Sequence, residues 1–337
     1  MSNLNDLTAL ALPSGSQLIA DATESRLSLS LDGQPLIRLR LDREGRGPIQ
    51  IDERFALPPG QALWAACYWL FARDPARQQL IWQLDQAPTE ALLSGLLVST
   101  EVAGEYRCER TLFWQLPQPW LGASLTGSYP QQMVISNGKR HPLRPVKPRG
   151  EVYRRFDARL GAWISLRTVE IEQDLARFNR WQNSPRVASF WQEEGSLEQH
   201  REYLSKLEAD PHTLTLIGCF DDQPFAYFEA YWAKEDRIAP FYDADNYDRG
   251  IHMLVGEENH RGPHKVASWL SALVHYLFLD DPRTQRVVAE PRADNAKMIG
   301  HMHNQCFHCE KEFDFPHKRA ALMILGRERF FDRCKLA

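Results

Sequence analysis

The chain has 337 residues, of which 43% are hydrophobic and 25% are charged, and its formal net charge is −4. This length allows two domains with cores of their own, and the charge gives the chain as a whole no bias toward nucleic acid. Six dispersed cysteines exclude a small disulfide scaffold, and no apolar run of about 18 residues predicts a membrane span. The N-terminus lacks the basic residues of a signal peptide, so we expect a cytoplasmic protein without a membrane partner.

The first part of the chain reads as an accessory α+β domain over residues 1–145. Residues 27–42 alternate apolar and polar side chains around Asp32-Gly33, which predicts a β-hairpin. Residues 62–74 have the composition of a buried helix, and residues 95–100 and 106–116 favour further strands. No group of side chains in this domain points to catalysis, and no internal repeat is visible along the chain.

A connector follows at residues 141–150, where proline and basic residues are dense and disfavour both helix and sheet. We therefore place the domain boundary between residues 145 and 146, with the second domain running to residue 337. The basic side chains of residues 138–159 are interpreted as those of a solvated connector, because the alternative, a nucleic-acid contact, has no support elsewhere in the composition.

The second domain alternates strands and helices, which predicts an α/β (α+β) fold: a mixed twisted sheet with helices on both faces. Pro185 should end the first helix, Ser196 should cap the second, and an Asp-Asp-Gln-Pro turn should join two central strands. The predicted elements are a strand at 163–169, helices at 172–184 and after Ser196, two strands within 213–233, a strand, loop and long helix within 247–281, a strand at 283–291, a short helix from Asp294 or Asn295, and closing strands within 310–325.

The loop before the long helix is a candidate anion site, because backbone N–H groups at a helix N-terminus attract phosphate. Its residues Arg261, His264 and Lys265 add charge suited to a pyrophosphate, and Gly262 and Pro263 shape the turn. By itself the pattern is weak, and an ordinary strand–helix turn explains it better.

Several long motifs in order resemble the GNAT acyltransferases of siderophore biosynthesis, and most of all the aerobactin-type N6-hydroxylysine acetyltransferases. The resemblance covers residues 145–325 and reaches weakly into the first domain through FWQLP. The motifs are FWQLP (113–117), PVKPRGEVYRRFD (145–157), SPRVASFWQEEGS (184–196), TLIGCFDDQPFAYFEAYWAKEDRI (215–238), YDRGIHMLVGE (247–257), LDDPRTQRVVAEPRADN (279–295) and EFDFPHKRA (312–320).

The resemblance implies acetyl-CoA as co-substrate, no metal, and a site at the place where two strands splay apart. It implies that His252 and Glu290 are the catalytic pair, and that a strand N–H near Leu254 holds the thioester oxygen. The residues that match the CoA-binding positions are Met253, Leu254 and Val255 for the pantetheine arm, Arg261, Gly262, Pro263, His264 and Lys265 for the pyrophosphate, and Asn295. Asn259 and His264 depart from the general GNAT loop but agree with the hydroxylysine branch.

The chemistry suits an acceptor amine that carries an N-hydroxyl group, because such an amine is weakly basic and largely neutral near pH 7. A carboxylate or an imidazole of moderate pKa can then take its proton. The alternative for His252 is a structural strand histidine, and for Glu290 a surface carboxylate. Trp232, Asp236 and Arg237 are candidates for the acceptor pocket. The three histidines and two cysteines of residues 301–309 are too close together to predict a zinc site.

Two alternatives to N6-hydroxylysine acetylation stay open. One is acylation of N5-hydroxyornithine or of a hydroxylated diamine, with acetyl- or succinyl-CoA. The other is a non-catalytic scaffold that binds acyl-CoA. A homodimer and association with a siderophore synthetase are further options that the sequence leaves undecided.

Overall fold

A computed structural model gives the structure of residues 8–23, 25–42, 47–55, 58–122 and 131–336. The chain divides into two units. The N-terminal unit comprises Met1–Trp120, Arg155–Ala162 and Lys335–Ala337, and the C-terminal unit comprises Leu121–Arg154 and Trp163–Cys334. The domain boundary expected between residues 145 and 146 stays a prediction.

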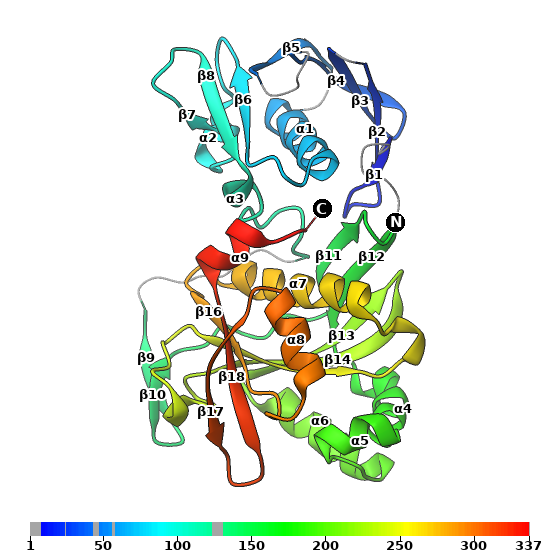
Figure 1. The fold of residues 1–337 in the computed structure, drawn as a ribbon, viewed down its shortest axis with the longest axis vertical. Helices are drawn as coiled ribbons and strands as arrows, with labels where there is room; N and C mark the ends of the chain where they lie inside the picture. The colour runs from blue at the N-terminus through cyan, green and yellow to red at the C-terminus, as the bar shows by residue number, and fades with distance from the viewer. Residues whose placement is uncertain (1–7, 24, 43–46, 56–57, 123–130, 337) are drawn as a thin grey trace. The chain divides into compact units, whose positions relative to one another are not determined.

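The N-terminal unit is built on an eight-stranded sheet with the order β1-β2-β3-β4-β5-β6-β8-β7 (Figure 1). Its predicted hairpin is confirmed: β3 and β4 pair antiparallel around Asp32-Gly33. The predicted buried helix is also confirmed as α1, which starts at a proline, the residue best suited to a first helical turn. The elements are β1 (Ala9–Ala11), β2 (Gln17–Ala22), β3 (Arg26–Leu31), β4 (Gln34–Arg40), β5 (Ile49–Arg54), α1 (Pro59–Arg73), β6 (Gln79–Gln83), α2 (Thr89–Leu93), β7 (Val98–Ser99), β8 (Glu105–Glu109) and α3 (Arg110–Phe113).

The C-terminal unit holds a small hairpin and most of a second eight-stranded sheet, with the order β11-β12-β13-β14-β15-β16-β18-β17. The pairing is antiparallel at the centre, and β15 and β16 run parallel. The elements are β9 (Met133–Ser136), β10 (Lys139–Pro142), β11 (Glu151–Asp157), β12 (Ala162–Thr168), α4 (Ile171–Gln182), α5 (Pro185–Trp191), α6 (Leu197–Ala209), β13 (Thr213–Phe220), β14 (Gln223–Trp232), β15 (Arg249–Val255), α7 (Pro263–Asp280), β16 (Arg286–Ala289), α8 (Ala296–Asn304), β17 (His308–Asp314), β18 (Arg319–Gly326) and α9 (Arg327–Arg333).

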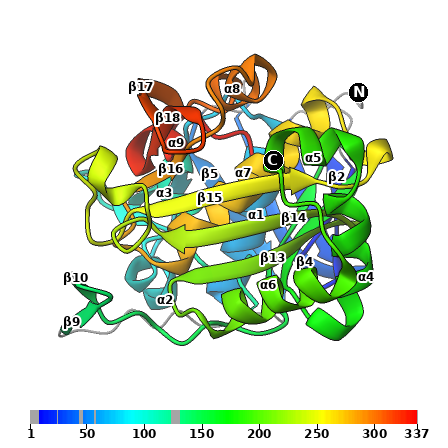
Figure 2. The ribbon, with the colours of Figure 1, turned by 90° about the horizontal axis from the view of Figure 1, so that it is seen from below.

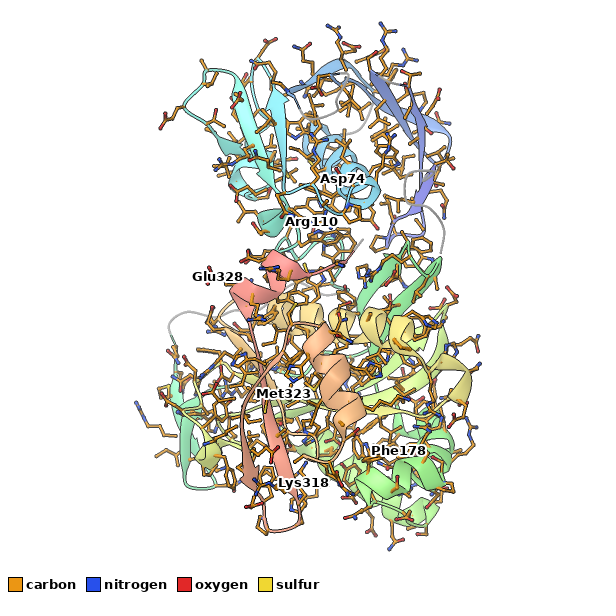
Figure 3. All side chains as sticks on the ribbon, viewed as in Figure 1. Asp74, Arg110, Phe178, Lys318, Met323 and Glu328 are labelled. Carbon is orange, nitrogen blue, oxygen red and sulfur yellow. The ribbon has the colours of Figure 1, made fainter. Side chains whose placement is uncertain are left out.

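Helices cover both faces of this second sheet, as predicted for a mixed α/β fold. Helices α4, α5 and α6 lie on one side of the sheet and α7 on the other (Figure 1), and Figure 2 shows β13, β14 and β15 as neighbouring strands. On the first face Phe178 of α4, labelled in Figure 3, packs against Tyr227 of β14 with ring centroids 4.7 Å apart. On the second face Trp269 of α7 stacks on Phe228 at 5.3 Å. Successive side chains of β14 point to opposite faces, so this strand contributes aromatic rings to the packing on both sides of the sheet.

Local signals placed most helix ends correctly and missed one helix start. Ser196 caps α6 through a full capping box with Gln199, as predicted for this residue type. The first helix ends at Gln182, but Pro185 then occupies the first turn of a new helix, α5, where its missing N–H has no cost. Strand β11 and helix α9 were also not predicted, and β11 lies within residues 138–159, whose basic side chains we interpreted as those of a solvated connector.

The two sheets repeat one topology, although no repeat is visible in the sequence. Each has five strands in chain order, then a strand reached by a helical crossover, then an antiparallel pair in reversed order. The crossover helices are α1 and α7, and each links two parallel strands. Both helices begin with proline. A repeat of this kind escapes sequence inspection because burial pattern, not residue identity, determines which strands pair.

Within the described residues, no helix is both long enough and apolar enough to cross a membrane. All six cysteines have free thiols.

Candidate active site

The centre of the candidate site lies on β14 and β15, on the sheet face that α4, α5 and α6 cover. Tyr227, Glu229 and Tyr231 alternate along β14 and therefore point to the same face. Glu229 pairs directly with His252 across the two strands. The side chains of these two residues are thus neighbours by register alone, because directly opposite Cβ atoms in an antiparallel pair lie about 5 Å apart.

Strands β15 and β16 separate at this point. Their register covers only two pairs, Arg249 with Val287 and Gly250 with Val288, whereas β15 stays paired with β14 as far as Val255. The edge of β15 from Ile251 onward consequently faces the opening between the two strands. His252 lies two residues beyond the last pair on β15, and Glu290 lies two residues beyond it on β16.

The structure brings His252 and Glu290 into direct contact at the opening. Nε2 of His252 lies 2.6 Å from Oε1 of Glu290, and its Nδ1 lies 2.8 Å from Oε2 of Glu229. Both carboxylates are buried, whereas the imidazole keeps 22% of its surface exposed. One imidazole therefore bridges two buried carboxylates, and it is the most exposed of the three side chains.

Each carboxylate has further donors that fix its position. The hydroxyls of Tyr203 and Tyr227 both donate to Oε1 of Glu229, at 2.5 and 2.9 Å. The hydroxyl of Tyr231 donates to Oε2 of Glu290 at 2.7 Å. Lys318, labelled in Figure 3, donates to the backbone carbonyl of Glu290 at 2.7 Å. A buried carboxylate that accepts several hydrogen bonds is held in its ionised form.

The charges of these groups shift the pKa of His252 strongly. Burial lowers it, but the attraction of Glu290 and the hydrogen bonds to both carboxylates outweigh burial and raise the pKa to about 10. Burial raises the pKa of Glu290, and the neighbouring imidazolium reverses this and lowers it to about 2. The expectation of an imidazole with a moderate pKa is therefore wrong: near pH 7 the pair is an imidazolium and a carboxylate.

Two glycines make room for this arrangement. A Cβ on Gly250 would lie 1.9 Å from the ring of Tyr231, so only glycine allows that ring to lie across β15 and reach Glu290. A Cβ on Gly256 would lie 2.2 Å from Trp181 of α4. Close packing of aromatic rings on β15 thus depends on the absence of side chains at these two positions.

A cavity of about 1270 Å³ runs along the opening and is lined by His252 and Glu290. Of the residues predicted to bind CoA, six line it: Met253, Leu254, Val255, Arg261, Gly262 and Asn295. Pro263, His264 and Lys265 do not, because they form the first turn of α7, where Lys265 packs its ammonium 4.4 Å from the ring centroid of Phe220. Asn295 caps α8 by accepting from the N–H of Met298.

The cavity has cationic and polar side chains that the sequence did not single out. Lys297 and His301 of α8 both line it, one helical turn apart. His301 belongs to the segment weighed as a zinc motif, and the structure turns it to the cavity instead. Arg186 of α5 donates to the carbonyls of Val255 and Gly256 at 2.7 and 3.1 Å and so fixes the end of β15.

Of the residues predicted to bind the acceptor, Asp236 and Arg237 line the cavity and Trp232 does not. The Trp232 ring is buried between the guanidinium groups of Arg144 and Arg249, 4.2 and 4.1 Å from its centroid. The prediction for Trp232 thus fails on geometry: its position on β14 turns it to the face opposite Tyr231. Arg237 lies 3.9 Å from Glu290.

The basic connector is not simply solvated, in contrast to our interpretation. Arg144 donates to both oxygens of Glu235 at 2.5 and 2.6 Å, and Lys139 donates to the carbonyls of Glu235 and Asp236. Lys147 donates to three more carbonyls of the same unit. These contacts hold the loop that carries Asp236 and Arg237 against the β9–β10 hairpin.

Glu229 is the functional candidate that sequence reasoning missed. It interrupts an aromatic run, FAYFEAYW, and a lone carboxylate among buried strand positions is costly unless it is paired. Alignment of β14 with β15 in their observed register would have placed it opposite His252. Across the described parts of the chain, no three His, Cys, Asp or Glu side chains are grouped so as to hold a metal ion.

A family model described as an acetyltransferase (GNAT) domain matches residues 170–315, which include β14, β15, β16 and α7. The N(6)-hydroxylysine O-acetyltransferase of Escherichia coli is 45% identical over 223 residues, and the match covers 66% of this chain and 70% of that protein. The chain therefore belongs to the GNAT family of N-acyltransferases.

A second relative is named as a hydroxyornithine transacylase. The N(5)-hydroxyornithine:cis-anhydromevalonyl coenzyme A-N(5)-transacylase SIDF of Beauveria bassiana is 42% identical over 276 residues, which cover 80% of this chain and 57% of that protein. The match thus spans little more than half of that longer relative. Among solved structures, an uncharacterized protein of Bacillus halodurans has a TM-score of 0.53 and 28% identity, covering 55% of this chain and 95% of that one.

Proposed function

We propose that the protein transfers the acetyl group of acetyl-CoA to the nitrogen of an N-hydroxylated amine, preferably N6-hydroxylysine, to form a hydroxamate for siderophore biosynthesis. One observation carries this proposal. A buried imidazolium–carboxylate pair, His252 and Glu290, lies at the opening between two diverging strands and faces a cavity large enough for an elongated co-substrate. The relatives that act on hydroxylysine and hydroxyornithine support the acceptor class.

In this proposal the acyl-CoA lies along β15, with Met253, Leu254 and Val255 beside the pantetheine arm. The thioester oxygen accepts from a strand N–H near Leu254, as an oxyanion does. Arg261 and Gly262 meet the pyrophosphate, and the dipole of α7 adds partial positive charge there. His264 and Lys265 contribute backbone N–H groups of the first turn, since their side chains lie outside the cavity lining, and Pro263, which has no N–H, sets the start of that turn. Lys297 adds positive charge along the cavity, and His301 adds a polar ring whose pKa burial lowers.

The pair can carry a proton from nitrogen to sulfur without help from another group. The acceptor nitrogen attacks the thioester carbon, and its N–H proton passes to the Glu290 carboxylate. The C–S bond breaks, and the sulfur leaving as thiolate takes the Nε2 proton of the His252 imidazolium. Transfer of the proton from Glu290 to His252 over 2.6 Å restores the ion pair. No covalent enzyme intermediate and no net proton uptake are needed.

The acceptor enters from the side of Asp236 and Arg237, opposite in charge and both at the cavity wall. An amino-acid acceptor carries an ammonium and a carboxylate, so these two side chains are matched to its two charges. Lys139 of the β9–β10 hairpin and Arg144, which follows the hairpin, support their loop. We also propose a cytoplasmic location, a homodimer and a siderophore synthetase as partner.

The test is thiol release from acetyl-CoA with lysine, N6-hydroxylysine, N5-hydroxyornithine and a hydroxylated diamine, followed by addition of Fe³⁺. An N-acylated product is a hydroxamate and gives a coloured ferric complex, whereas an O-acylated product does not. We expect the highest kcat/KM with N6-hydroxylysine and a coloured product. Higher kcat/KM with N5-hydroxyornithine would favour the second acceptor class, and CoA binding without turnover on any hydroxylated amine would favour the scaffold.

A further inference from the structure

Glu229 is a buried carboxylate for which the proposed proton transfer has no role. It comes from the middle of β14, where every neighbouring side chain along the strand is aromatic or small. Its Oε2 lies 2.8 Å from Nδ1 of His252, and its Oε1 accepts from the hydroxyls of Tyr203 and Tyr227. These three partners are thus donors fixed by the sheet or by α6, and one of them is the imidazole.

We propose that Glu229 is a positioning residue that holds the Nδ1–H of His252, so that the imidazole exchanges protons only through Nε2. This inference rests on the proposed function. The two ring nitrogens differ in their surroundings: Nδ1 faces a carboxylate that two tyrosines immobilise, whereas Nε2 faces Glu290, the carboxylate that takes the amine proton in the proposed reaction. A histidine whose one nitrogen is held by a carboxylate keeps one tautomer and one ring orientation.

The arrangement has a physical consequence for the neutral state of the site. In the proposed reaction His252 gives its Nε2 proton to sulfur after Glu290 has taken the amine proton, so the unprotonated Nε2 faces a protonated carboxyl group. An unprotonated Nδ1 would instead face the charged, buried Glu229 carboxylate. Tyr203 and Tyr227 leave Glu229 no donor with which to replace Nδ1–H, since both hydroxyls already donate to the other oxygen. A buried acceptor that loses its donor is destabilised, because no hydrogen bond then offsets its loss of hydration. Glu229 thereby acts on the reaction only through the imidazole.

The first test is the pH profile of kcat for Glu229→Gln. An opposite charge nearby shifts a pKa by about 1–3 units, so the alkaline limb set by the imidazolium should move down by about 1–3 pH units. Asp174→Asn is the matched control: Asp174 is a buried carboxylate bound by Arg167 and Arg177 outside the cavity lining. It should lower stability and leave the limb in place. An unshifted limb in Glu229→Gln would overturn the proposal.

The second test does not depend on turnover or on folding of the Glu229 variant. In Glu290→Gln the pKa of His252 falls, and the ¹⁵N shifts of the labelled imidazole can be read with the ring neutral. We expect the remaining proton on Nδ1. A neutral ring protonated on Nε2 would refute the role of Glu229. These spectra report the position of the imidazole proton even if the protein acylates no hydroxylated amine. Failure of this inference can therefore be distinguished from failure of the proposed function.

Discussion

Replacement of Glu290 by glutamine should abolish most of the turnover and leave CoA binding intact. The amide keeps the size of the carboxylate and can still accept a hydrogen bond from Tyr231, which now reaches Oε2 at 2.7 Å. What it loses is the negative charge, which the His252 imidazolium preserves by lowering the pKa of Glu290 to about 2, and with it the oxygen that takes the amine proton. The change therefore separates proton transfer from packing.

The magnitude follows from the role assigned to the carboxylate. A positioned general acid–base group contributes about 10²–10⁴ in rate, which is about 3–5 kcal/mol of barrier. We expect kcat to fall by that factor in a thiol-release assay, with the dissociation constant for CoA unchanged by calorimetry. Asp174→Asn, a buried carboxylate outside the cavity lining, is the control for a general loss of buried charge. A Glu290→Gln enzyme that kept a tenth or more of wild-type kcat would refute the assignment.

Three further predictions concern packing, the acceptor loop and pH. Gly250→Ala places a methyl group against the ring of Tyr231 and should cost about 1–3 kcal/mol of stability and reduce kcat. Gly300→Ala is the control, because a Cβ there meets nothing within 4 Å, and it should have neither effect. Denaturant unfolding compares the stability of the two variants. Arg144→Ala should raise KM for the acceptor more than for acetyl-CoA, because it frees the loop that lines the cavity. Arg149→Ala, an exposed arginine of the same connector, is its control, and equal effects would contradict the account. The raised pKa of His252 means that its share of stability is complete below about pH 6.5 and disappears as the pH rises toward 10. Unfolding free energies at pH 6, 8 and 10 should therefore decline, and a flat profile would contradict the pKa shift.

Local sequence signals were sufficient for much of the second domain. The Ser196 cap, the turn at Asp221 and Asp222, and the alternation along β14 each depend on interactions within a few residues. The start of α5 was missed because Pro185 serves as a helix breaker after one segment and as a first-turn residue for the next. The same residue type carries both signals, and only the fold decides between them.

Family motifs pointed to some residues of the candidate site. Residues whose place depends on strand register could not be predicted in this way. His252 and Glu290 were found from their motifs, and the structure brings them within hydrogen-bonding distance. Glu229 was missed because its meaning appears only when β14 is aligned with β15. Trp232 was misplaced for a related reason: its aromatic character suggests a pocket, but strand alternation turns it away from the cavity.

The contacts between the connector and the loop that carries Asp236 and Arg237 could not have been predicted from composition. Basic residues near prolines are usually solvated, and here Lys139 and Arg144 satisfy groups about 90 residues away in the chain. Long-range contacts of this kind follow from topology, which a charge run does not encode.

The measurement that tests the central claim most directly is a structure of the protein with an acetyl-CoA analogue whose sulfur is replaced by a methylene group. We predict that the pantetheine arm lies in the opening where β15 leaves β16, with the acyl carbonyl hydrogen-bonded to a backbone N–H of β15 and the acyl carbon facing His252 and Glu290. An analogue bound outside this opening, or with its acyl carbon directed away from that pair, would contradict the account.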